Sequence, residues 1–66
     1  MEMFYDLVYG NYGSEENQEK FKDIDDLKSC FKSLVNIGRF DYVVARKIII
    51  YDDGTDDIDI IWNFQN

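Results

Sequence analysis

Residues 48–62, "IIIYDDGTDDIDIIW", require the chain to turn back on itself. Two runs rich in isoleucine flank an Asp-Gly pair, and β-branched runs on either side of Asp-Gly are typical of a β-hairpin. The sequence therefore predicts strands over residues 41–51 and 56–64. Five aspartates lie between positions 52 and 59, and their role is open: they bind a metal, attract a partner or only solvate the turn.

The length of the turn decides which side chains share a face of this hairpin. A two-residue loop, Asp53-Gly54, would set Ile48 opposite Asp59. A three-residue loop over residues 52–54, with Gly54 left-handed, shifts the pairing by one. We favour the longer loop because it separates apolar from charged positions, and because opposite charges facing each other across strands contribute about 0.2–1 kcal/mol. Its pairs are Lys47 with Asp59, Ile48 with Ile58, and Val44 with Trp62.

This register gives the hairpin two faces of different character. We expect the helix to pack on the more apolar face, which carries Val44, Arg46, Ile48, Ile50, Ile58, Ile60, Trp62 and Phe64. Arg46 interrupts that face, and its aliphatic stem is expected to lie along the helix with the guanidinium in solvent. The second face is half apolar and half charged, and carries Val43, Ala45, Lys47, Ile49, Tyr51, Asp57, Asp59, Ile61 and Asn63.

A helix is predicted before the hairpin. Asp23 suits the N-cap, and Asp25 and Asp26 follow in the first turn, where the helix dipole favours negative charge. Gly38 is expected to end the helix in the left-handed conformation, with Asn36 as the alternative. The apolar residues that recur at helical spacing are Ile24, Leu27, Phe31, Leu34 and Val35.

The start of the chain completes the predicted fold. Residues 3–9, "MFYDLVY", predict a strand with apolar groups on both faces, and residues 19–22 predict a short edge strand with Phe21 pointing inward. The result is a single α+β domain over residues 1–66, with one helix on a three- or four-stranded antiparallel sheet in two layers. We expect the first and last strands to be central neighbours because both are apolar on two sides.

Charge is distributed unevenly along a chain whose net charge is −7. Residues 2–19 and residues 52–66 each contain five acids and no base, and all seven bases lie between them. Direct binding to nucleic acid is disfavoured because phosphate contacts need lysine and arginine, whereas a basic protein surface would be attracted. If the first and last strands are neighbours, Asp6 joins the acids at 52–59 in one negative surface.

The expected cellular location follows from the absence of membrane-spanning and signal-peptide patterns in the sequence. No apolar run approaches the roughly 20 residues of a membrane span, and the N-terminal segment has no basic region of the kind that opens a signal peptide. We therefore expect no membrane association. Cys30 is the only cysteine, and a lone thiol suits the reducing cytoplasm.

The residue types that catalysis needs are scarce. The absence of histidine removes the commonest general base and metal ligand. Cys30 has no base to activate it and is expected to pack as a small apolar residue. The aspartates around Gly54 lack the spacing of an EF-hand calcium loop, so a solvated turn is favoured. We expect no catalytic residue, no metal and no cofactor, and therefore not an enzyme.

The remaining feature is tyrosine near carboxylate. Tyrosine is common in binding hot spots, and Asp57 and Asp59 project from one side of a strand about 6.5–7 Å apart, a regular spacing of negative charge. The candidate partner-binding residues are Tyr5, Asp6, Tyr9, Tyr51, Asp52, Asp53, Asp56, Asp57 and Asp59. We expect a non-catalytic acidic binding protein that occupies a basic, nucleic-acid-binding surface of a host protein. In size and charge alone, the chain resembles the small acidic inhibitors of phages and mobile elements, such as DNA mimics.

Two alternatives stay open. The half-apolar second face would be buried against another copy in a homo-oligomeric structural or accessory domain, for example a homodimer. The residues that motivate this alternative are Val43, Ala45, Ile49, Tyr51 and Ile61. An immunity protein or antitoxin that neutralises a basic toxin would have the same charge pattern as the leading hypothesis.

Overall fold

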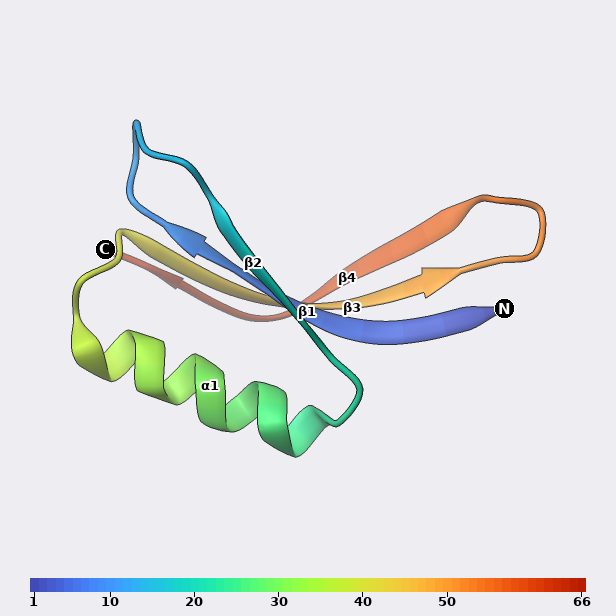
Figure 1. Ribbon diagram of the computed structural model, residues 1–66, viewed down its shortest axis with the longest axis horizontal. Helices are drawn as coiled ribbons and strands as arrows, with labels where there is room; N and C mark the ends of the chain where they lie inside the picture. The colour runs from blue at the N-terminus through green and yellow to red at the C-terminus, as the bar shows by residue number, and fades with distance from the viewer.

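The computed structural model describes residues 1–66, which form four strands and one helix (Figure 1). The strands are β1 (Glu2–Gly10), β2 (Asn17–Phe21), β3 (Tyr42–Ile50) and β4 (Asp56–Gln65), and helix α1 (Ile24–Ile37) connects β2 to β3. All strand pairs are antiparallel and the helix packs on one side of the sheet. The predicted α+β fold of one helix on an antiparallel sheet is confirmed.

The strands lie in the order β2-β1-β3-β4. β1 is central, but its second neighbour is β3, so the prediction that the first and last strands are neighbours is wrong. The physical reason is charge. β4 alternates Asp57 and Asp59 with isoleucines, and an edge position leaves these carboxylates in water. β3 carries apolar residues on both faces and fills the centre. β2 forms the other edge, and Phe21 packs against the core as predicted.

Helix α1 begins and ends where the local sequence predicts. The Asp23 carboxylate accepts a hydrogen bond of 2.8 Å from the backbone N–H of Asp25, an N-cap of the kind that contributes about 1 kcal/mol. Gly38 takes the left-handed conformation at φ 72°, and its N–H donates to the carbonyl of Val35. This C-cap satisfies a carbonyl that the last helical turn leaves without a partner.

The β3–β4 register follows the prediction only as far as a β-bulge. Near the turn the predicted pairs form, namely Lys47 with Asp59 and Ile48 with Ile58. Ile61 then has no partner on β3, and the ladder shifts by one residue, as it does at a β-bulge. Beyond the shift the pairs are Ala45 with Trp62, Val44 with Asn63 and Val43 with Phe64. The predicted pairing of Val44 with Trp62 is therefore wrong.

The helix covers the face of β3 opposite to the predicted one. Residues directly opposite each other on paired strands share a face, and the helix-covered face carries Tyr5, Leu7, Tyr9, Val43, Ala45, Trp62 and Phe64. The open face, as we call the other side, carries Phe4, Asp6, Val8, Val44, Arg46, Ile48, Ile58 and Ile60. The bulge is the physical reason, because it lets Trp62 and Phe64 reach the helix beside Ala45 and Val43.

A small core forms where the helix meets the two central strands. Its fully buried members are Leu7, Leu27, Val43 and Ala45. Trp62 lies against Phe31 of the helix, with ring centroids 5.8 Å apart. Val43 and Ala45, which the sequence analysis placed on a surface available to a second copy, are thus inside the protein.

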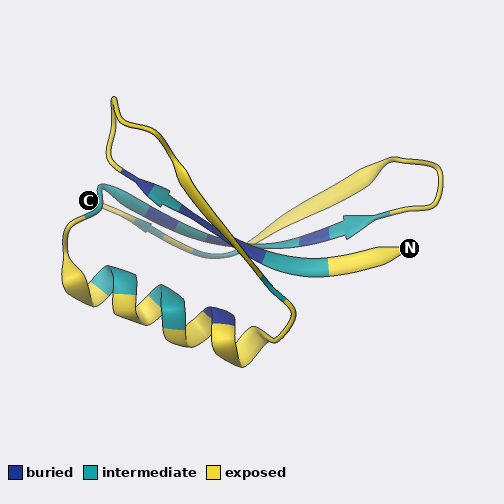
Figure 2. Ribbon diagram, viewed as in Figure 1, coloured by how far each residue is buried: buried dark blue, intermediate teal, exposed yellow.

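The helix covers only one end of the sheet, whose principal extents with the helix are 38, 27 and 14 Å. In Figure 1 the β3–β4 turn and the start of β1 extend past the first turn of α1. Figure 2 shows most of the buried residues where α1 faces the central strands, while the β3–β4 turn and the adjoining part of β4 are exposed. Every residue from Tyr51 to Ile60 is exposed. The one helix is not long and apolar enough to cross a membrane.

Candidate partner-binding hairpin

The β3–β4 turn is the predicted three-residue loop over residues 52–54. Gly54 has a φ of 88°, which glycine adopts without a steric penalty. The backbone N–H of Tyr51 donates to the carbonyl of Thr55 at 2.8 Å, and that of Gly54 donates to the carbonyl of Tyr51 at 3.0 Å. These bonds hold the turn in one conformation and fix the directions in which its carboxylates point.

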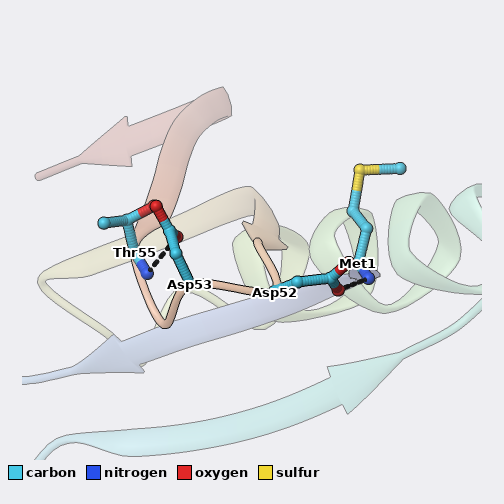
Figure 3. Close-up of polar contacts among 4 residues, drawn as sticks. All are labelled: Met1, Asp52, Asp53 and Thr55. Carbon is cyan, nitrogen blue, oxygen red and sulfur yellow. Dashed lines mark hydrogen bonds and ion pairs between the residues drawn. The ribbon is translucent and has the colours of Figure 1, made fainter.

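Asp53 stabilises the turn through hydrogen bonds to a residue of the same turn. Its carboxylate accepts hydrogen bonds from the backbone N–H of Thr55 (3.0 Å) and from the Thr55 hydroxyl (2.6 Å), as drawn in Figure 3. Both bonds favour the ionised form, so the pKa of Asp53 lies below its ordinary value. Asp53 is therefore a structural acid as well as a surface charge, and one oxygen is already engaged.

Asp52 contacts the beginning of the chain. The amino group of Met1 forms an ion pair with its carboxylate (Figure 3). Both groups are largely exposed, and an exposed pair of this kind contributes between 0 and about 1 kcal/mol. The contact brings the start of β1 next to the turn that follows β3.

Asp57 and Asp59 project from β4 on the same side as the helix but beyond its end. The Tyr51 hydroxyl donates to the Asp57 carboxylate at 2.7 Å, and this bond together with the nearby negative charge raises the pKa of Tyr51. Lys47 lies directly opposite Asp59 in the ladder, yet the two do not form an ion pair. The carboxylate of Asp59 thus stays available to another cation.

The hairpin carries negative charge without cations to neutralise it. The structure contains two ion pairs, between Met1 and Asp52 and between Arg46 and Asp6. Asp53, Asp56, Asp57 and Asp59 therefore have no cationic partner, and all four are exposed. The tip of the β3–β4 hairpin is a site where carboxylates and one tyrosine hydroxyl meet the solvent together.

The structure separates the other three predicted residues from this hairpin end. Tyr5 and Tyr9 are half-buried against the core on the helix-covered face. The Tyr9 hydroxyl donates to Glu19 at 3.0 Å, and the Tyr9 ring meets Phe40 edge-on at 5.0 Å between centroids. Both rings thus serve mainly in packing, and Tyr51 is the only tyrosine of the predicted set at the hairpin end.

Asp6 is fully buried, on the open face of the sheet. Arg46 lies directly opposite it and donates from Nε (2.8 Å) and from a terminal guanidinium nitrogen (2.6 Å), while Gln18 donates a third hydrogen bond at 2.8 Å. Burial raises the pKa of Asp6, but the hydrogen bonds from Arg46 and Gln18 and the charge of Arg46 outweigh burial, so the pKa lies below its ordinary value.

Two expectations about these charges are therefore wrong. Arg46 does not extend along the helix but faces away from it, because its charge is satisfied by Asp6 on the neighbouring strand. Asp6 does not join the acids at 52–59 in one negative surface, because it is enclosed and already neutralised.

The exposed isoleucines of β4 are a feature that was not predicted from the sequence. Ile58 and Ile60 are 50% and 62% exposed, and they project from the open face while Asp57 and Asp59 project from the other. The signal was present in the strict alternation "DIDI" at residues 57–60, which is typical of a strand with one apolar and one charged side. The prediction that Ile58 and Ile60 pack under the helix is therefore wrong.

No pocket is present in the structure, and no three metal-binding side chains lie close together. The pKa of the Cys30 thiol is raised, mainly by burial and to a smaller extent by the nearby Glu19 carboxylate.

The chain matches no protein-family model, no curated protein and no solved structure. Its own geometry defines its class, a small acidic two-layer α+β module with an exposed, negatively charged hairpin.

Proposed function

We propose that this chain is a non-catalytic acidic binding protein whose β3–β4 hairpin binds a basic surface of another protein. The observation that carries the proposal is the hairpin end itself, where four exposed aspartates have no cationic partner and no helix covers them. Charges in this arrangement steer a basic partner towards the protein and form new ion pairs on contact.

The partner class we favour is a nucleic-acid-binding protein, whose function the chain would inhibit by occupying its basic groove. Such a groove already holds lysine and arginine at positions set by phosphate spacing. Asp57 and Asp59 lie on one side of a strand, about 6.5–7 Å apart, and therefore offer regularly spaced negative charge to such a groove. A basic toxin neutralised by this chain would be bound in the same way.

The test compares two variants that remove the same charge at different places. In the hairpin variant, the acids of β4 become amides: Asp56→Asn, Asp57→Asn and Asp59→Asn. In the control, three exposed acids elsewhere change: Glu15→Gln, Asp25→Asn and Asp26→Asn. Wild type and control are expected to capture a basic protein from host lysate at low salt and to release it at high salt, with double-stranded DNA competing, and the hairpin variant is expected to capture nothing.

Two outcomes would contradict this proposal. One is that no partner is retained by the wild type. The other is that hairpin and control variants bind equally well, since binding would then depend on net charge and not on the hairpin.

Self-association is the second candidate, and the open face is the observation that favours it. Ile58 and Ile60 are exposed there beside the nearly buried Ile48, and exposed apolar patches mark interaction surfaces. Light scattering separates the two candidates: a dimer whose mass persists in the hairpin variant favours self-association, and a monomer at high concentration excludes it.

A further inference from the structure

The outer edge of β4 is free along its whole length. β4 occupies one end of the strand order and spans ten residues, whereas β2 at the other end spans five. An edge strand presents a row of backbone N–H and carbonyl groups that another strand can pair with. β4 therefore offers a free edge for the addition of a strand.

The turn fixes which backbone groups face outward. In an antiparallel ladder, hydrogen-bonded pairs alternate with pairs that make no bond to each other. The hydrogen bond from the Tyr51 N–H to the Thr55 carbonyl identifies these two residues as a hydrogen-bonded pair. Every second residue along β4 is then hydrogen-bonded to β3, so the backbone groups of Asp57 and Asp59 point towards β3. The backbone groups of Ile58 and Ile60 consequently point away from the sheet.

The side chains along this edge alternate in the same register. Ile58 and Ile60 are exposed on the open face, and Asp57 and Asp59 are exposed on the other. A strand that pairs with this edge would place every second side chain beside the isoleucines and the others beside the carboxylates. The complementary sequence is one that alternates apolar with basic residues.

The same charges disfavour a second copy of this chain at the edge. Antiparallel pairing of two β4 strands about Ile58 would place Asp57 opposite Asp59 of the second copy, and like charges directly opposite each other are destabilising. The bulge at Ile61 interrupts the straight edge, so the docking segment is confined to residues 56–60.

We infer that residues 56–60 of β4 bind an extended segment of the partner by adding it to the sheet, and that the segment alternates lysine or arginine with apolar residues. This inference rests on the proposed function and specifies how the basic partner is recognised. Backbone hydrogen bonds would supply affinity, and the two faces of β4 would supply specificity.

A pair of synthetic peptides tests the inference with defined probes. The first is a short peptide that alternates lysine and valine, and the second has the same composition with the lysines and valines in separate blocks. NMR titration of the labelled protein is expected to show shifts centred on residues 56–60 and slower hydrogen exchange at the amides of Ile58 and Ile60 with the alternating peptide. The block peptide should bind at least about tenfold more weakly.

Two changes to the backbone distinguish strand addition from charge attraction. Ile58→Pro removes a backbone N–H that points outward and leaves the hydrogen bonds to β3 in place. Proline is tolerated at such an edge position. Ile58→Val serves as the matched control. The alternating peptide should bind the valine variant normally and the proline variant at least about tenfold more weakly. If the proline variant does not fold, the alternating peptide N-methylated on its β4-facing amides makes the same test on the wild type.

The inference is wrong if the block peptide or the N-methylated peptide binds as tightly as the alternating peptide. It is also wrong if the shifts map elsewhere, or if a second copy protects these amides without peptide. If strand addition is wrong, the proposed function still holds when the proline variant captures the basic protein from lysate and the hairpin variant does not. The proposed function itself fails when the wild type captures no partner.

Discussion

Asp6 and Arg46 lie opposite each other on the two central strands, and Arg46 donates two hydrogen bonds to a carboxylate that has no exposed surface. The pair is on the face of the sheet that no helix covers. Gln18 from β2 completes the arrangement with a third bond, so one carboxylate links three strands. Because a buried ion pair often adds little net stability, we expect this one to act mainly by fixing the register of the strands.

We predict that Asp6→Ala lowers the free energy of unfolding by about 2–4 kcal/mol, because it leaves the Arg46 charge without a partner among apolar neighbours. The double variant Asp6→Leu/Arg46→Met should recover most of that loss, since a buried ion pair can often be replaced by apolar residues of similar volume. Urea unfolding of Asp6→Leu, Arg46→Met and the double variant measures the coupling between the two side chains. Equal losses in the Asp6→Ala variant and the double variant would contradict this reading.

Stability should also depend on Asp6 in acid. The pKa of folded Asp6 lies below its ordinary value of 3.8, so its contribution to stability is complete above that value and is lost as the pH falls through the folded pKa. Between about pH 5 and pH 2, wild type should lose more stability than Asp6→Leu/Arg46→Met. Urea unfolding at a series of pH values provides the comparison. Parallel curves for the two proteins would show that Asp6 does not govern the acid transition.

The helix should depend on one residue for its attachment. Leu27 is fully buried in the core, whereas Ile24, one turn earlier, is 42% exposed. Leu27→Ala is expected to cost about 3 kcal/mol through lost burial and the cavity it leaves, and Ile24→Ala less than about 1 kcal/mol. Thermal unfolding followed by circular dichroism and by Trp62 fluorescence compares them. Similar losses at the two positions would mean that the helix is not held by this core.

The bulge gives an unusual prediction for deletions. Removing Ile61, which has no partner on β3, leaves Trp62 and Phe64 on the helix-covered face, so the protein should fold with a loss of about 1–2 kcal/mol from the contacts of Ile61 itself. Removing Asn63 transfers Phe64 to the open face and should cost about 3 kcal/mol or more. Cross-strand NOEs between Val43 and Phe64 report the arrangement. The reverse ranking of the two deletions would contradict the observed register.

Apart from the α+β fold class itself, the features predicted correctly from the sequence are local. The Asp23 cap, the Gly38 terminus and the Asp52-Asp53-Gly54 turn each depend on residues within a few positions of one another. The acidic hairpin end was predicted for the same reason, because a turn exposes what it contains. These features have strong sequence signals and need no knowledge of the rest of the sheet.

The errors arise where distant residues decide the outcome. One unpaired residue, Ile61, changes which face of β3 meets the helix, and strict alternation along "DIDIIWNF" does not reveal it. Arg46 looked like an interruption of the core because its partner, Asp6, is 40 positions away. Tyr5 and Tyr9 lie on the helix-covered face because of the distant pairing of β1 with β3, which the local sequence does not reveal.

The pairing of β1 with β3 determines how this chain can fold. Glu2 lies opposite Ile50, so the centre of the sheet cannot form until the chain has been made as far as Ile50. During synthesis β1 has only β2 beside it, and its other edge stays open until β3 leaves the ribosome. Topologies dominated by such distant contacts fold slowly for their size, and the exposed edge is open to mispairing in that interval. We therefore expect a chain of this length to fold more slowly than a helical bundle of equal size.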